Sequence, residues 1–228
     1  MSEGDTDTAR KESIYTRLPF MEVQLENKDP YLDIVEAMRE PRTMMTHLPF
    51  TFFNKSIIEA APRVIVIMRN PRDMLVSSYH YYKNCLDIDW TWEEIFEVFK
   101  NKGLIFGDWF DSVSSWYTNV NKRNFLFLHY EEMNTNAEKV VRRILHFLNK
   151  ELPDDVLQKI LDYTSFQGMK TNPVANLSTL GLFKPDGEFM RKGSVGDWKN
   201  TFTVAQKEYM EEVYEKQLDQ LQLNFQFQ

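Results

Sequence analysis

The chain has 228 residues, of which 43% are hydrophobic and 14% aromatic, and its formal net charge is −7. Such a composition supplies a substantial core and excludes disorder over most of the chain. The acidic balance argues against non-specific nucleic-acid binding, because a polyanion requires a basic surface. An anionic ligand would therefore need a local basic pocket.

Cysteine usage and hydropathy bear on the compartment. Cys85 is the single cysteine, so no intramolecular disulfide can form, which fits a reducing environment. Residues 1–13 read as a flexible polar tail without the apolar stretch of a secretory signal. No segment approaches the roughly 20 apolar residues of a membrane span. We therefore expect a cytoplasmic protein without a membrane anchor, and a single domain over residues 14–228.

The first predicted elements are a helix at residues 30–38 and a strand at residues 63–68. The Val-Ile-Val-Ile run in this strand is continuous and β-branched, as in a parallel strand buried on both faces. Asn70 then suits a helix N-cap and Pro71 suits the first helical position. A helix should run from there to about Lys83.

The rest of the chain alternates in the same way. Residues 124–129 predict a second strand, and residues 171–190, with mixed composition and several Pro and Gly, predict a long loop of the lid or binding type. Periodicity and capping boxes predict further helices at residues 92–101, 107–120, 137–149, 153–162 and from Thr203 toward Leu218. Strands alternating with helices indicate an α/β fold of three layers, with a mostly parallel sheet flanked by helices.

Three motifs carry candidate binding and catalytic groups. The first is Arg191 to Asn200, Arg-Lys-Gly-Ser-Val-Gly-Asp-Trp-Lys-Asn, in which a guanidinium, an ammonium and a glycine backbone suit an anion. The second is Arg69 at the carboxyl end of the first strand, with Ser77 about two helical turns further on. The third is His47 in Thr-His-Leu-Pro, a side chain suited to accept a proton near neutral pH.

Each motif has a structural alternative. The Arg-Lys-Gly string could be a basic surface turn, and Arg69 could form a surface salt bridge. Ser77 could be a small helix residue, and His47 could be a packed or surface histidine. The other histidines, His80, His129 and His146, stand in no comparable motif.

Together the three motifs resemble those of the cytosolic sulfotransferases, which use 3′-phosphoadenosine 5′-phosphosulfate (PAPS). Residues 66–82, with Met-Arg-Asn-Pro leading into a Ser- and Tyr-rich helix, resemble the family's phosphate-binding strand, turn and helix. The resemblance implies a P-loop-NTPase-like sulfotransferase fold. It also implies transfer of the sulfuryl group of PAPS to a hydroxyl or amine of a small molecule. The cofactor product is then 3′-phosphoadenosine 5′-phosphate (PAP), and no metal is required.

The resemblance assigns roles residue by residue. In the family the matching Arg and Ser hold the 3′-phosphate, a role carried here to Arg69 and Ser77, with Arg191 converging on the same phosphate. The matching His, here His47, removes the acceptor proton as the acceptor attacks sulfur. The remaining cofactor-binding candidates are Tyr130, Thr164, Ser165, Phe166, Phe189, Met190, Lys192 and Gly193.

Two further sets follow from the same resemblance. The candidate acceptor pocket consists of residues that could equally belong to the core: Phe20, Tyr81, Leu182 and Phe183. Lys199, Thr203, Val204 and Glu208 match the family's short dimerisation motif and predict a homodimer, although Thr203 is also explained as a helix cap.

The chain departs from the family at one important place. The family's 5′-phosphosulfate loop, of the type Pro-Lys-Ser-Gly-Thr-Thr-Trp, is absent, and none of the eight glycines stands in such a loop. We therefore expect the first strand and its loop to be missing, which leaves a catalytically impaired PAP-binding or dimerising remnant as the alternative function. Met45 also replaces a lysine that many members carry. A nucleotide-kinase-like reaction is disfavoured because no Walker lysine is present.

Overall fold

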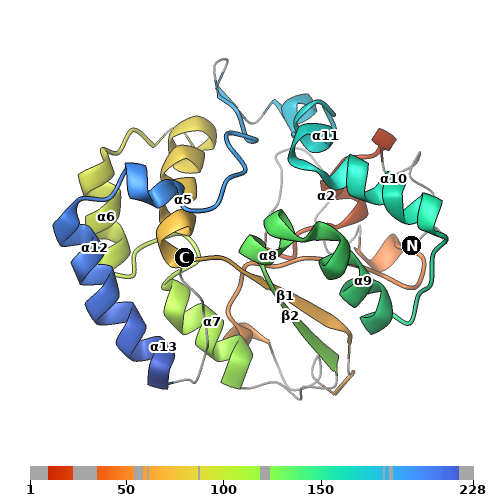
Figure 1. Ribbon diagram of the computed structural model, residues 1–228, viewed down its shortest axis with the longest axis horizontal. Coiled ribbons are helices and arrows are strands. Elements are labelled where there is room, and N and C mark those ends of the chain that lie inside the picture. The colour runs from red at the N-terminus through yellow and green to blue at the C-terminus, as the bar shows by residue number, and fades with distance from the viewer. Residues whose placement is uncertain are drawn as a thin grey trace. The chain divides into compact units, whose positions relative to one another are not determined.

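The computed structural model describes residues 10–22, 35–53, 59–60, 62–86, 88–118, 124–181, 183–184 and 187–220 (Figure 1). Two compact units are distinguished, one made of residues 1–48 and 150–191 and the other of residues 49–149 and 192–228. We call them unit 1 and unit 2. The expectation of one domain over residues 14–228 stays a prediction. Residues 1–9 of the expected tail, residues 30–34 of the first expected helix and Leu182 lie outside the described residues.

A parallel pair of strands forms the centre of unit 2. Strand β1 (Val64–Met68) pairs with β2 (Phe125–His129), with Val64 opposite Phe125 and Met68 opposite His129. Both predicted strands and their parallel relation are confirmed. The prediction that β1 is buried on both faces is wrong, because Met68 is buried but Ile67 is 58% exposed.

Helix α5 (Pro71–Cys85) begins as its sequence predicts. The Asn70 side chain accepts the Arg72 N–H at 2.9 Å, and Pro71 occupies the first turn, where its missing N–H leaves no bond unmade. The first turn, from Pro71 to Asp73, is buried, so α5 starts inside unit 2 rather than on its surface.

The other helices of unit 2 follow the predictions within one to three residues, apart from the short helix α8, which was not predicted. The capping boxes predicted at Thr91 and Thr203 are both formed. These helices are α6 (Trp92–Lys100), α7 (Trp109–Thr118), α8 (Tyr130–Thr135), α9 (Ala137–Phe147) and α12 (Val204–Met210), which continues through a π-helical segment (Glu211–Glu215) into α13 (Lys216–Gln220). Short 3-10 helices occur at Phe50–Phe52 and Asp197–Asn200.

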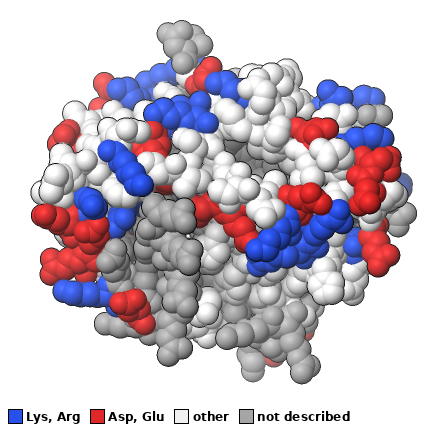
Figure 2. All heavy atoms as spheres, in the orientation of Figure 1, with Lys and Arg blue, Asp and Glu red and all other residues white. Residues whose placement is uncertain are grey.

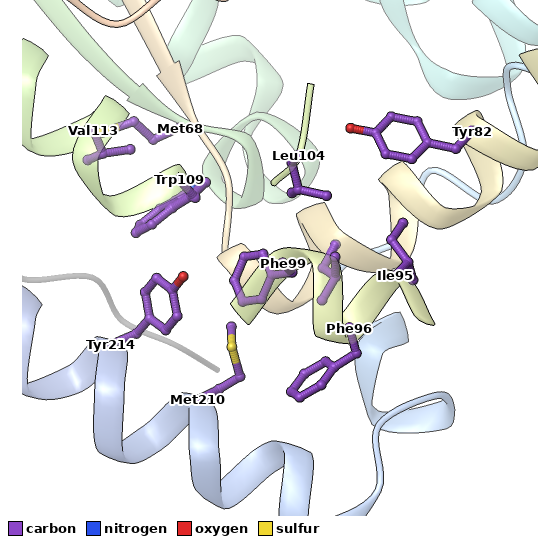
Figure 3. Packing of buried hydrophobic residues seen from close by; sticks show 11 residues of the cluster. Met68, Tyr82, Ile95, Phe96, Phe99, Leu104, Trp109, Val113, Met210 and Tyr214 are labelled. Atoms are coloured by element: carbon purple, nitrogen blue, oxygen red, sulfur yellow. The ribbon is translucent and has the colours of Figure 1, made fainter. Parts of the chain in front are cut away.

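The hydrophobic core of unit 2 lies where α6 meets α7 and the C-terminal helices (Figure 3). Phe99 and Tyr214 stack with ring centroids 5.4 Å apart, and Met210 is fully buried beside them. Burial raises the pKa of the Tyr214 phenol, which donates to Asp108 at 3.1 Å. This core anchors the C-terminal helices that follow the predicted phosphate loop.

Unit 1 is built from short elements. A parallel bridge joins Phe20 to Met45, and residues 35–37 are helical, the described part of the helix expected at 30–38. Its named helices are α2 (Ile14–Arg17), α10 (Asp154–Thr164), α11 (Phe166–Lys170) and a 3-10 turn (Ser178–Leu180). The described part of residues 171–190 is otherwise irregular, as expected for a long loop.

Across the described helices, none combines the length and the apolar character that spanning a membrane requires.

Candidate functional site

The register of the sheet brings Arg69 and Tyr130 together. Because Met68 is opposite His129, the next residue of each strand leaves the same edge of the sheet. The Arg69 guanidinium lies 4.2 Å from the centre of the Tyr130 ring, a cation–π contact. Two residues 61 positions apart, both predicted to bind cofactor, are thus neighbours in unit 2.

The loop after Arg191 is held at the same edge by a buried carboxylate. Asp73, in the first turn of α5, is 1% exposed. It accepts the Gly196 N–H at 2.6 Å and the Trp198 N–H at 2.9 Å. An ionised carboxylate with two backbone N–H donors makes strong, directional bonds. Asp73 therefore fixes this loop against the helix that carries Ser77.

A second contact supports the same loop from the side. The Arg72 guanidinium lies 4.6 Å from the Trp198 ring centre and 3.8 Å from a Glu211 carboxylate oxygen. Trp198 and Arg72 are both buried. Consequently the turn is bound to α5 through two successive residues, Arg72 and Asp73, and to the C-terminal helical run through Glu211.

Ser77 and Lys192 differ in how accessible they are to a ligand at this edge. Ser77 is exposed and lies one helical turn beyond Asp73, on the face of α5 that meets the loop. Lys192 extends back to Asp197, with its ammonium 2.7 Å from the carboxylate, so part of its charge is already neutralised. Gly193 has φ of 65°, a left-handed conformation that a residue with a side chain would adopt only with strain.

The donor set fits a phosphate group. The Arg69 Nε is enclosed and, among the described residues, has no hydrogen-bond acceptor, while another nitrogen of the same guanidinium is 3.5 Å from the Ser194 carbonyl. An enclosed donor without an acceptor costs about 1–3 kcal/mol, and phosphate oxygens are well matched to guanidinium N–H groups. Arg69, Ser77 and the Gly193 backbone are the groups of unit 2 that would hold it.

Carboxylates close to this edge are already engaged. Glu131 accepts the Asn70 N–H at 2.8 Å. A hydrogen bond from Lys139, with the charge of Arg143, holds the pKa of Glu132 below its usual value. On the face shown in Figure 2, basic and acidic side chains are interspersed, so any preference for an anion is local. Within the described residues, no group of three or more His, Cys, Asp or Glu is placed to hold a metal ion.

His47 belongs to unit 1 and has its own surroundings. Its Nδ1 lies 2.9 Å from Glu22 Oε1, which also accepts the His47 backbone N–H at 2.6 Å. The Phe20 ring is nearly parallel to the imidazole, with centroids 4.9 Å apart. Phe20, predicted as an acceptor-pocket residue, is therefore packed against the predicted base.

The remaining cofactor candidates also lie in unit 1, so their predicted meeting with Arg69 stays a prediction. The Thr164 hydroxyl donates to the Ile160 carbonyl at 2.8 Å, and the Ser165 hydroxyl caps α11 through the Gly168 N–H at 3.0 Å. Phe166 opens α11. Phe189 is exposed and lies 5.8 Å from Phe183 between ring centres, while Met190 and Arg191 are partly buried.

The other predicted sets are spread over the chain. Tyr81 is partly buried against the core of unit 2, whereas Phe20 and Phe183 belong to unit 1, so their meeting in one acceptor pocket stays a prediction. In the dimer motif, Val204 is 73% exposed at the start of α12, and Lys199 and Glu208 are exposed as well. Thr203 is the N-cap, which supports its structural explanation.

Two residues that hold candidate groups in place, Asp73 and Glu22, are not among the residues predicted from the sequence. Both make bonds to residues 25 to 125 positions away, which leave no periodic pattern. A signal for Asp73 did exist: an acid directly after Asn-Pro-Arg and a Gly-x-Trp turn can pair through backbone N–H groups.

The chain is similar to known proteins in sequence and fold. The family described as "Sulfotransferase domain" matches residues 1–222. Mouse "Sulfotransferase 1 family member D1" is 38% identical over 98% of this chain and 78% of its own length. Human "Sulfotransferase 1C2" is 36% identical over 97% of this chain and 77% of its own length.

Solved structures agree in fold. A mouse sulfotransferase crystallised with PAP superposes with a TM-score of 0.72 at 31% identity, covering 82% of this chain and 69% of its own. Retinol dehydratase, solved with retinol and PAP, superposes with a TM-score of 0.84 at 21% identity, covering 97% of this chain and 75% of its own. At that identity the second comparison concerns the fold alone.

Proposed function

Because this chain belongs to the sulfotransferase family, whose reaction is sulfuryl transfer from PAPS, we propose that it sulfates a hydroxyl or amine of a small molecule with His47 as general base. The observation that carries the proposal is Arg69, enclosed between the Tyr130 ring and the Ser194 carbonyl with its Nε lacking an acceptor among the described residues.

In this proposal the groups of unit 2 bind the 3′-phosphate. Arg69 supplies paired N–H donors, Ser77 a hydroxyl and Gly193 a backbone N–H at close approach. Lys192, shared with Asp197, contributes less than Arg69. Tyr130 orients the guanidinium and contacts adenine, and Thr164, Ser165, Phe166, Phe189, Met190 and Arg191 complete the nucleotide site.

The chain's own chemical contribution comes from His47. When bound, PAPS supplies the sulfuryl group and PAP is the product that leaves. The imidazole would take the proton of the acceptor as the acceptor oxygen or nitrogen forms its bond to sulfur, which keeps the attacking atom neutral or less positive. Its side chain is 48% exposed, which permits an acceptor to approach. No metal is needed for these roles.

Several finer assignments belong to the same proposal. Phe20, Tyr81, Leu182 and Phe183 would line the acceptor pocket. A homodimer would form through Lys199, Thr203, Val204 and Glu208, and the exposure of Val204 supports this, since a small interface needs an accessible apolar residue. The family resemblance further suggests a cytoplasmic enzyme.

The test is to replace His47 by Ala and measure both sulfuryl transfer and PAP binding. We expect turnover with a panel of phenols, alcohols and amines to fall by at least about 100-fold, the usual contribution of a general base, while the thermal shift with PAP is kept. His146→Ala, on α9 in unit 2, is the matched control and should retain turnover. Full turnover by the His47 variant would refute the assignment of the base.

One alternative has its own support. None of the glycines stands in a loop that could wrap a 5′-phosphosulfate, so a protein that binds PAP without transferring sulfate is the second candidate. It predicts a PAP thermal shift that depends on Arg69, together with no transfer to any acceptor of the panel.

A further inference from the structure

Glu22 holds His47 through two bonds to a single oxygen. Glu22 Oε1 accepts the His47 backbone N–H at 2.6 Å and lies 2.9 Å from the ring Nδ1. The Glu22 side chain is 11% exposed, whereas the His47 side chain is 48% exposed. A nearly buried carboxylate therefore contacts the Nδ1 edge of the His47 imidazole, while about half of the His47 side chain remains exposed.

The chemistry of the pair decides which nitrogen carries hydrogen. An ionised carboxylate accepts hydrogen bonds and donates none, so the 2.9 Å contact requires hydrogen on Nδ1. In the neutral ring the basic lone pair is then on Nε2. The negative charge beside Nδ1 also favours the imidazolium that forms when Nε2 takes a proton, as the carboxylate of a catalytic triad does.

Ring orientation is fixed independently of this bond. Phe20 stacks on the imidazole with an interplanar angle of 10°, and Tyr15 packs on Phe20 with centroids 5.1 Å apart. The strand-like bridge between Phe20 and Met45 holds the two segments in register, with N–H to carbonyl bonds of 3.0 Å from Met21 to Met45 and from Met45 to Pro19. The backbone thus sets Glu22 opposite His47.

We propose that Glu22 is the positioning residue of the base: it holds His47 as the Nδ1–H tautomer, directs Nε2 toward the acceptor and stabilises the charged ring. This inference rests on the proposed role of His47. The segment Leu-Pro-Phe-Met-Glu, with Glu two residues after Phe20, therefore serves the proton transfer as well as the acceptor pocket.

The tautomer is measured directly on the full chain. Long-range proton–nitrogen NMR spectra of histidine-labelled protein, recorded at an alkaline pH where imidazoles are neutral, distinguish the two tautomers. His47→Gln assigns the signals. We expect the His47 ring as the Nδ1–H tautomer in the wild type and as a mixture in Glu22→Ala. An Nε2–H ring in the wild type, or an unchanged Nδ1–H ring in Glu22→Ala, overturns the proposal.

Kinetics supply a second readout that a merely structural residue would not give. Glu22→Gln keeps the shape but loses the charge, and we expect kcat to fall about 10–100-fold, with the acceptor KM changing less than about twofold. Glu40→Gln, an exposed carboxylate of unit 1 paired with Arg42, is the matched control. An unchanged kcat in Glu22→Gln overturns the role of the charge.

The two proposals fail in different ways. If His47→Ala retains turnover, the general-base assignment is lost, yet the NMR spectra still decide whether Glu22 sets the tautomer. If His47→Ala is inactive while Glu22→Ala keeps the wild-type tautomer and Glu22→Gln keeps the wild-type kcat, the base stands and the role of Glu22 is rejected.

Discussion

The surroundings of Arg69 and those of His47 differ in burial and in the sequence distance of the contacts that stabilise them. The Arg69 edge is fixed by buried side chains acting over long sequence distances, since Asp73 bonds to residues 123 and 125 positions away. His47 is held by Glu22, 25 positions away, and by a ring stacked on a half-exposed imidazole. The proposed phosphate-binding group and the proposed general base thus have different structural supports.

This difference has a physical reason. The cationic donors of a phosphate site repel one another, and water competes with the phosphate for their N–H groups. Binding is therefore stronger when these donors are held in place before the ligand arrives. A general base must meet the acceptor and exchange a proton, so part of the ring has to remain accessible. Substitutions should therefore harm stability and nucleotide binding together at the first place, and turnover alone at the second.

The largest effect is expected from Asp73→Ala. It leaves the partly buried N–H of Gly196 and the buried N–H of Trp198 without their acceptor, at about 1–3 kcal/mol for a buried group and less for the other, so the free energy of unfolding should fall by roughly 2–4 kcal/mol. Urea unfolding measures this loss, and the PAP thermal shift should weaken with it. Asp89→Ala, whose carboxylate is exposed and 3.8 Å from Lys83, should change stability by less than about 0.5 kcal/mol.

A smaller effect is expected from the phosphate-binding side chains themselves. Arg69→Ala removes charge-assisted bonds of about 1.5–3 kcal/mol, which corresponds to a PAP Kd raised roughly 10–100-fold in calorimetric titration. Arg63→Ala, at the opposite end of β1 and bonded to the Leu148 carbonyl, should leave the Kd unchanged.

The double variant Arg69→Ala/Arg191→Ala tests whether the two arginines bind the same phosphate. If both guanidinium groups bind one phosphate, the double variant should lose less affinity than the two single losses added together. Strictly additive losses would place the two arginines at separate groups.

The smallest effect concerns the helix that follows the fixed loop. Thr203→Ala removes the cap of α12 and should cost about 1 kcal/mol of unfolding free energy while the homodimer persists. Val204→Asp adds an acid to the first turn, where it suits the helix dipole, so stability should stay within about 0.5 kcal/mol as the dimer dissociates. Sedimentation velocity reports the oligomeric state, and a dimer that survives Val204→Asp would exclude this interface.

Local elements of unit 2 were predictable because their signals are local. Asn70 and Pro71 mark the start of α5, and the capping boxes at Thr91 and Thr203 mark two more helices within four residues each. The parallel relation of β1 and β2 followed from alternating strands and helices, and it placed Arg69 directly after the carboxyl end of β1, while ligand binding at this edge stays a prediction.

Side-chain partners were not predictable in the same way. Nothing in the sequence around Arg69 shows that Tyr130 would stack on it, because the strand register decides that contact. Ile67 looked like a core residue from its β-branched neighbours but is exposed, since burial depends on which elements cover a strand rather than on the strand itself. Glu22 was overlooked for the related reason that a bridge between two short segments positions it.

Asp73 also bears on when the proposed phosphate site can form during synthesis of the chain. Its two N–H partners belong to Gly196 and Trp198, so a nascent chain on the ribosome cannot make both bonds until it has been extended past Trp198. These bonds close a loop of more than a hundred residues between Asp73 and the turn. The entropic cost of closing this loop therefore arises in one late step of folding, after the turn has been translated. We therefore expect the proposed site to bind nucleotide only after the turn from Gly196 to Trp198 has been synthesised.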